Sequence, residues 1–210
     1  MSVHDVMAAA GKLKSVKRQG WLDAGIPAEQ VESVADHSFR VAFMAAFLAP
    51  RAIGGKSGRT RQRGLDVLKM VRMALVHDLA ESVVGDLTPR SGVPPKMKAR
   101  MEEEAMRSLG DRGLLAIWKE YEAGRSPEAN LVREADVAER VITAHEYIGT
   151  GHPAGRLAHF LEGGKYEVKG REFLALLDGC IHKRTGKRHP EIPPMRCKRP
   201  VYRCAFGRPR

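Results

Sequence analysis

The sequence predicts an all-α protein, and three observations support this fold class. Apolar residues recur at the three- and four-residue spacing of amphipathic helices along most of the chain. Prolines and glycines fall between these segments, where they begin and end helices. No clean two-residue turn joins two alternating apolar runs, so β-hairpins are not expected. The predicted architecture is a bundle of helices.

Length and composition indicate one compact domain. The chain has 210 residues, of which 43% are hydrophobic, enough to form a single core. It contains no apolar run long enough to cross a membrane. The first residues, MSVHDVMAAAGKLK, lack the apolar segment and cleavage site of a secretory signal. We therefore expect a cytoplasmic protein with no membrane span.

The net charge of +11 is concentrated at the C-terminal end. Residues 179–210 contain ten Lys or Arg and one acid, a charge of +9, which leaves +2 for residues 1–178. Five prolines and three glycines in this segment leave too few apolar positions for a packed element. We predict a catalytic domain over residues 1–178 and a poorly ordered basic tail over residues 179–210, which could bind nucleic acid.

All three cysteines lie in the predicted tail and cannot cross-link the body of the protein. Together with two histidines of the tail they could hold zinc, but they lack the close spacing of recognised zinc sites. An irregular tail is the favoured interpretation. The five residues are Cys180, His182, His189, Cys197 and Cys204.

The first strong helix signal covers residues 33–49. Ser33 and Asp36 have the spacing of a capping box, and the following residues are apolar on nearly every side. Pro50 is expected to end this helix. The glycine-rich and basic residues 51–64 that follow predict a surface loop.

A second apolar helix is predicted over residues 65–84, with Gly85 as its stop. His77 and Asp78 lie near its carboxyl end. A third helix, amphipathic, is expected to begin at Pro94 and Pro95 and to end at Gly110. Shorter helical patterns cover residues 114–121, 127–147 and 172–177.

Four polar residues within these apolar helices are difficult to explain as core: His37, His77, Asp78 and Asp136. Carboxylates are rarely buried unless they are paired or bind a metal. Two imidazoles and two carboxylates suit a divalent first-row metal and leave positions for water and substrate. Adjacent helix positions diverge by about 100°, so His77 and Asp78 can share an ion only over their common edge. Alone, this dipeptide is a weak signal.

The order of these residues, H, then HD, then D, resembles the HD-domain metal-dependent phosphohydrolases. Within that superfamily four strings are similar to the HD-domain 5'-deoxynucleotidases: LKSVKRQGW, ESVADHSFRVAFMA, RMALVHDLAESVVGDLTP and READVAERVITAHEY. The resemblance covers Leu13 to Leu177. It implies an HD-domain helical bundle, usually a homodimer, that removes phosphate from deoxyribonucleoside 5'-monophosphates. It also implies a divalent metal, cobalt or manganese first, with magnesium, iron and zinc as alternatives.

Carried over by position, the resemblance makes His37, His77, Asp78 and Asp136 the metal ligands. Glu81 matches a catalytic acid or base, so that Asp78 and Glu81 are the expected catalytic residues. Glu81 follows His77 by four positions, so we expect it to project from the same helix face one turn later and to address the same pocket. A surface glutamate near a helix end is the alternative.

Three further residues are expected to bind the substrate. By resemblance Asp86 contacts a sugar hydroxyl, although an aspartate here could also cap a turn. Arg18 could bind phosphate with its fork of donors. Trp21 could cover the sugar, but a tryptophan at this position is equally well explained as core.

The sequence is also compatible with two other functions. An HD-domain enzyme could act on a nucleoside triphosphate, a cyclic nucleotide or a guanosine polyphosphate, although a longer phosphate chain requires more Lys and Arg near the metal. Alternatively, the basic tail could make the chain a nucleic-acid-binding protein with a vestigial metal site.

Overall fold

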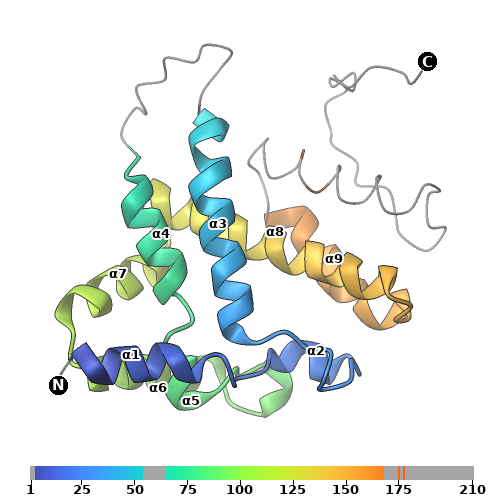
Figure 1. Cartoon of the computed structure of the whole chain (residues 1–210), viewed down its shortest axis with the longest axis horizontal. Helices are drawn as coiled ribbons and strands as arrows, with labels where there is room; N and C mark the ends of the chain where they lie inside the picture. Colours follow the sequence, from blue (N-terminus) through green and yellow to red (C-terminus); the bar gives the residue numbers. More distant parts are fainter. Residues whose placement is uncertain (1–2, 54–64, 168–174, 176, 178–210) are drawn as a thin grey trace.

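The computed structural model describes residues 3–53, 65–167, 175 and 177 (Figure 1). Within these ranges the regular structure is helical, apart from one isolated bridge between Lys17 and Ser33. This confirms the all-α prediction. No helix in the described part is long and apolar enough to cross a bilayer. The predicted basic tail, its cysteines and most of the helix expected over residues 172–177 lie outside the described residues.

Five helices form the body of the bundle. α3 (Val34–Ile53) runs through its centre and packs against α4 (Val67–Val76) on one side. α8 (Pro127–Gly149) crosses both of these helices and carries α9 (Ala154–Glu167) along its other flank. α7 (Arg112–Ala123) packs against α4 and α8 (Figure 1). Helices α7 and α8 confirm the patterns predicted at 114–121 and 127–147.

A second layer lies across one end of this body (Figure 1). It contains α1 (Val3–Lys12), α2 (Gln19–Asp23), α5 (Glu81–Val84), a 3-10 turn (Pro89–Ser91) and α6 (Pro95–Ser108). The sequence predicted α6 but not α1, α2 or α9. α1 contributes no fully buried residue, α2 has only five residues and α9 contains three glycines. Each of these properties weakens a helical pattern.

The apolar side chains form two cores that meet along α3 and α4. The larger core lies among α3, α4 and α8, and the smaller one lies toward the second layer. On α3, Val34 belongs to the smaller core and Val41 to the larger. On α4, Met73 belongs to the larger core and Val76 to the smaller. His37 lies between the two valines, so it occupies the junction of the two cores.

The start of α3 confirms the predicted capping box. The Ser33 hydroxyl accepts from the Asp36 backbone N–H at 3.1 Å, and the Asp36 carboxylate accepts from the Ser33 N–H at 2.9 Å. The predicted end of this helix is wrong, because α3 continues past Pro50 to Ile53. Pro50 lies in the final turn, where its missing N–H removes a single hydrogen bond near the helix end.

The predicted continuous helix over residues 65–84 is also wrong. α4 ends at Val76, and α5 begins only at Glu81. Between them the chain turns more tightly, with i to i+3 bonds of 3.0 Å from Leu79 N to Val76 O and from Glu81 N to Asp78 O. The break lies at the polar pair that reaches the site, so tertiary contacts override an otherwise helical pattern. Gly85, at φ 77°, ends α5 as expected.

The larger core predicts losses of stability of very different size for two positions on α4. Met73 is fully buried, whereas Leu75 is 50% exposed. Met73→Ala should lower the free energy of unfolding by about 2 to 5 kcal/mol, because it leaves a cavity. Leu75→Ala should change it by less than about 0.5 kcal/mol. Chemical denaturation of both variants measures this difference, and equal losses would contradict the described packing.

Candidate metal centre

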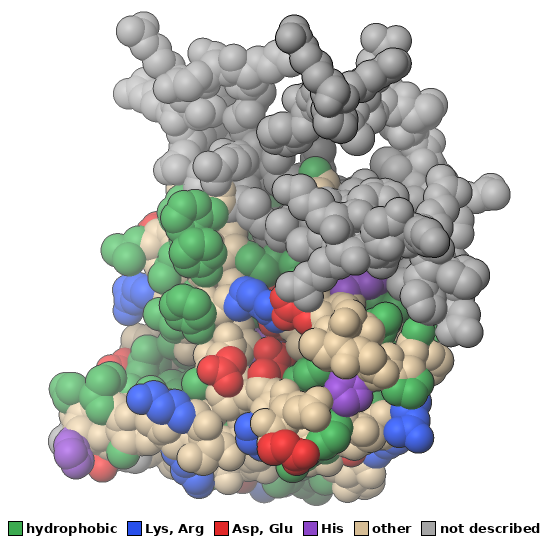
Figure 2. Space-filling model, turned by 45° about the vertical axis from the view of Figure 1, so that its right-hand side comes forward, with side chains coloured by type: hydrophobic (Ala, Val, Ile, Leu, Met, Phe, Trp, Pro, Cys, Tyr) green, Lys and Arg blue, Asp and Glu red, His purple; other side chains and the backbone are tan. Residues whose placement is uncertain are grey.

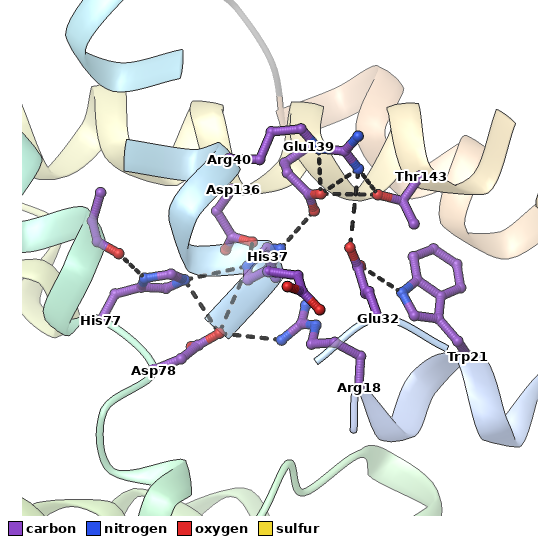
Figure 3. A network of polar contacts seen from close by, with 12 residues as sticks. Arg18, Trp21, Glu32, His37, Arg40, His77, Asp78, Asp136, Glu139 and Thr143 are labelled. Carbon is purple, nitrogen blue, oxygen red and sulfur yellow. Dashed lines mark hydrogen bonds and ion pairs between the residues drawn. The ribbon is translucent and has the colours of Figure 1, made fainter. Parts of the chain in front are cut away.

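His37 enters the site from α3 with its imidazole fully buried. Its Nδ1 donates to Glu139 Oε2 at 2.5 Å, which assigns the proton to that nitrogen. The opposite nitrogen, Nε2, lies 3.3 Å from Asp136 Oδ1 and 3.6 Å from Asp78 Oδ2. The ring therefore presents a lone pair toward two carboxylates (Figure 3).

His77 approaches the same point from the end of α4. Its Nδ1 donates to the backbone carbonyl of Ala74 at 2.7 Å, so its Nε2 is also left as an acceptor. This Nε2 lies 3.4 Å from His37 Nε2 and 3.2 Å from Asp78 Oδ2. In the turn after α4 the carboxylate of Asp78 lies beside the imidazole of His77. Both side chains therefore face His37 Nε2.

The donor set fits a divalent metal ion. His37, His77 and Asp78 each offer one ligand atom, and the three atoms lie within 4.8 Å of one another. With both Nδ1 atoms donating elsewhere, two ring lone pairs face each other and a carboxylate, an arrangement that repels itself unless a cation lies between them. Nitrogen and oxygen donors of this kind bind first-row divalent metals.

Asp136 lies beside this trio rather than within it. It extends from α8, and its Oδ2 accepts from the Tyr121 hydroxyl at 3.1 Å while its Oδ1 faces His37. The structure thus brings together all four residues predicted as ligands. Their role as ligands stays a prediction.

The charges of the site attract cations. Burial alone would raise the pKa of Asp78, but His77, Arg18 and His37 hold it well below its usual value. Burial and Arg18 lower the pKa of His37, yet Glu139 and Asp136 outweigh them and raise it to about 10. The carboxylates therefore stay ionised, and the cluster favours a positive charge at its centre, either a second proton on His37 Nε2 or a metal ion in place of that proton.

Glu81 is the first residue of α5 and is buried beside the cluster. Burial, reinforced by the charges of Asp78 and Asp86, raises its pKa well above the usual value. Its Oε2 is buried with no hydrogen-bond partner among the described residues. The alternative of a surface glutamate is therefore wrong. A carboxyl group that is buried and uncommitted is suited to exchange a proton.

Arg18 connects the cluster to Asp86. Its Nη1 lies 3.2 Å from Asp78 Oδ2 and 3.9 Å from Asp86 Oδ2. Asp86 follows Gly85, and its Oδ2 accepts from the Gln19 backbone N–H at 2.7 Å. This bond holds the carboxylate against the start of α2, so both residues line one edge of the site.

Trp21 lies in α2 and is only 2% exposed. Its ring packs against Phe160 and Tyr147, with centroid distances of 4.1 and 5.3 Å. Its Nε1 donates to Glu32 Oε1 at 2.9 Å. This burial favours the interpretation of Trp21 as a core residue, and its contact with a substrate stays a prediction.

Sequence reasoning missed two charged residues next to His37. Arg40 donates from Nε to Glu139 Oε1 at 2.8 Å, while Glu139 holds the His37 ring. A signal for both was present in the sequence. Arg40 follows His37 by three positions and Glu139 follows Asp136 by three, the spacing of residues that share a helix face.

Comparison with known proteins identifies the family. The model of the HD domain matches residues 10–169, about three quarters of the chain. The chain belongs to the HD domain family. This confirms the resemblance stated from the order of His37, His77, Asp78 and Asp136.

Relatives of this HD domain are found in distant eukaryotes. The chain is 36% identical to 5'-deoxynucleotidase HDDC2 of Homo sapiens over 191 residues, which are 88% of this chain and 87% of that protein. It is 38% identical to 5'-deoxynucleotidase HDDC2 of Dictyostelium discoideum over 144 residues, 65% of this chain and 73% of that protein. Among solved structures, a conserved hypothetical protein from Pyrococcus furiosus superposes with a TM-score of 0.68 at 29% identity, covering 84% of this chain and 97% of that one.

The HD-domain site predicts that two of its carboxylates, Asp78 and Glu81, differ in their effect on metal binding. Asp78→Ala should abolish binding of Mn²⁺, because it removes an oxygen of the ligand trio. Glu81→Gln should bind Mn²⁺ with nearly the affinity of the unmodified chain, since Glu81 is outside that trio. Isothermal titration calorimetry on the folded variants measures both. Tight Mn²⁺ binding by Asp78→Ala would show that the ion is held elsewhere.

Proposed function

We propose that this HD-domain protein is a metal-dependent 5'-deoxynucleotidase, which hydrolyses deoxyribonucleoside 5'-monophosphates to a deoxynucleoside and phosphate. The observation that carries the proposal is the convergence of His37 Nε2, His77 Nε2 and Asp78 Oδ2. The substrate class is supported by the relatives that bear this name, at 30% to 38% identity.

His37, His77, Asp78 and Asp136 would hold the divalent metal. When bound, such an ion neutralises charge on phosphate oxygens and makes water more acidic, so no protein nucleophile is needed. We propose cobalt or manganese, with magnesium, iron and zinc as alternatives that the same nitrogen and oxygen donors accept.

Glu81 would manage the proton of the reaction. Its carboxyl is buried and one of its oxygens makes no hydrogen bond within the described part of the chain, so it can accept a proton from water or return one to the leaving hydroxyl. Its raised pKa supports this role, because a group transfers protons best when its pKa lies near the pH at which the enzyme works.

Arg18, Asp86 and Trp21 would position the nucleotide. The guanidinium of Arg18 offers several N–H donors for the phosphate. It lies next to Asp78 Oδ2, the oxygen that would also face the metal. Asp86 would bind a sugar hydroxyl, since its Oδ1 makes none of the contacts that hold its Oδ2 against α2. Trp21 would support this edge of the site from within the core.

A longer phosphate chain fits this site less well. Two arginines, Arg18 and Arg40, lie next to the ligand cluster, and Arg40 is already paired with Glu139 and Glu146. Arg18, whose Nη1 pairs with Asp78 and Asp86, offers a single fork for phosphate, and one fork suits a monophosphate. We also propose that residues 1–178 form the catalytic unit, which the family match at residues 10–169 supports. The proposed location of the protein is the cytoplasm.

A phosphate-release screen tests the proposed activity. With Mn²⁺ or Co²⁺ supplied, deoxyribonucleoside 5'-monophosphates should release phosphate faster than ribonucleoside monophosphates or nucleoside triphosphates. Asp78→Ala should release none, and Glu81→Gln should be slower by about 10² to 10⁴-fold while still binding the metal. Release at the normal rate by folded Asp78→Ala would refute the mechanism, and preference for triphosphates would refute the substrate class.

We also propose that the protein is a homodimer that buries an aromatic ridge on α3. Phe39, Phe43 and Phe47 are 68%, 54% and 50% exposed, and successive rings lie 6.3 and 4.4 Å apart. Figure 2 shows hydrophobic side chains stacked on the upper left of the drawn face. Because the three phenylalanines lie four positions apart along one helix, two copies can pair antiparallel with Phe43 on the twofold axis.

Sedimentation of one variant tests the dimer. The unmodified chain should sediment at twice its chain mass, and Phe43→Asp at the chain mass, because a charge at the centre of the ridge cannot be buried against its copy. Met97→Asp replaces a side chain of similar exposure on α6 and should remain dimeric. A dimeric Phe43→Asp would place the interface elsewhere.

A further inference from the structure

Glu139 is a fully buried carboxylate on α8 that the proposed reaction does not use. It faces the side of the His37 ring that points away from the ligand cluster, with Oε2 at 2.5 Å from Nδ1 (Figure 3). We propose that Glu139, braced by Arg40, is a positioning residue that fixes the orientation and the electron donation of the metal ligand His37. The inference rests on the proposed metal site, although it does not depend on the substrate.

Glu139 is placed to orient a ligand rather than to be one. Its Oε2 is used by His37, and its Oε1 accepts from Arg40 Nε at 2.8 Å, Arg40 Nη2 at 2.6 Å and Thr143 Oγ1 at 2.9 Å. Rotation of the carboxylate would break all of these bonds at once. The Nδ1 proton of His37 is therefore held in place, and Nε2 stays directed at Asp78 and Asp136.

The two candidate histidine ligands are oriented by different kinds of acceptor. His77 donates to the neutral carbonyl of Ala74, a backbone group that no substitution removes. His37 donates to a carboxylate, which is negatively charged and makes the ring a stronger electron donor at its other nitrogen. Glu139 therefore acts on one ligand alone, and a substitution can separate its effect from that of the rest of the site.

Arg40 makes burial of this carboxylate possible. An unpaired buried carboxylate is strongly unfavourable, and Arg40 supplies the opposite charge from the helix that also carries His37. The arginine is held at its outer end by Glu146, 2.8 Å from Nη1, and it approaches Glu32 at 4.0 Å. Glu32 in turn accepts from Trp21 (Figure 3). The bracing network thus extends from the metal ligand to α2.

Two buried glutamates of α8 provide a matched comparison. Glu128 is also buried and bound to a cation, with Lys69 Nζ at 3.2 Å, but it precedes Glu139 by about three helical turns and does not contact His37. Glu139→Gln and Glu128→Gln each remove one buried charge from the same helix. A purely structural role would make the two variants behave alike.

Calorimetric titration of the folded full-length variants with Mn²⁺ tests the inference. Glu139→Gln should weaken Mn²⁺ binding by about 10- to 100-fold, the range for the partner of a ligating histidine. Glu128→Gln should bind Mn²⁺ within about twofold of the unmodified chain, whatever its loss of thermal stability. The Co²⁺ absorption bands should shift for Glu139→Gln and not for Glu128→Gln, because only the first alters a ligand.

A second variant keeps the inference testable if Glu139→Gln does not fold. Arg40 is about one third exposed at its side chain, so Arg40→Gln disturbs the core less. It should also weaken Mn²⁺ binding, because Glu139 loses its brace. Unchanged Mn²⁺ affinity in folded Glu139→Gln, or in Arg40→Gln where Glu139→Gln cannot be obtained, would overturn the inference. An equal loss of affinity in Glu128→Gln would do the same.

The result of the Mn²⁺ titration can be told apart from the result of the phosphate-release screen. Mn²⁺ titration and Co²⁺ spectra are measured without substrate, so a weakened site in Glu139→Gln supports the inference even if the screen finds no deoxynucleotidase activity. Conversely, normal Mn²⁺ affinity in Glu139→Gln together with phosphate release by the unmodified chain would remove this role of Glu139 and leave the activity in place.

Discussion

The meeting of two imidazole lone pairs and a carboxylate inside the protein is the constraint on which the rest of the structure depends. His37 Nε2 and His77 Nε2 lie 3.4 Å apart, with Asp78 Oδ2 close to both. Such a group of acceptors is stable only with positive charge at its centre and with each ring held from behind. A backbone carbonyl holds one ring and a charged network the other. α4 itself provides the first support, through the Ala74 carbonyl three residues before His77, and the packing of α3 against α8 provides the second.

The same requirement explains the interrupted helix at the site. On a continuous helix His77 and Asp78 would diverge by about 100°, and only their common edge could face one point. The tight turn after Val76 removes this restriction and lets both side chains face His37. It also turns α5 so that Glu81 is buried beside the cluster. A local departure from helical geometry thus gathers both candidate ligands and the candidate proton carrier.

Periodic patterns made the main helices and the ligand candidates predictable from sequence. The capping box of Ser33 and Asp36, the proline start of α6 and the pattern of α8 all depend on neighbouring residues, and each was confirmed. The break at His77 was not predictable, because no glycine or proline marks it and the contacts that His77 and Asp78 make there are with residues distant in the sequence. Burial of Trp21 and the partners of Arg40 likewise depend on which helices face each other. A local pattern contains no such information.

The position of His37 at the junction of two cores has a consequence for the life of the protein in a cell. An ion held there would tie the core shared by α3, α4 and α8 to the core of the second layer. Binding to the folded form alone raises its stability with the logarithm of the free ion concentration. Scarcity of the metal would therefore increase the unfolded fraction that proteases remove. The amount of enzyme, and not only its turnover, would then follow the supply of metal.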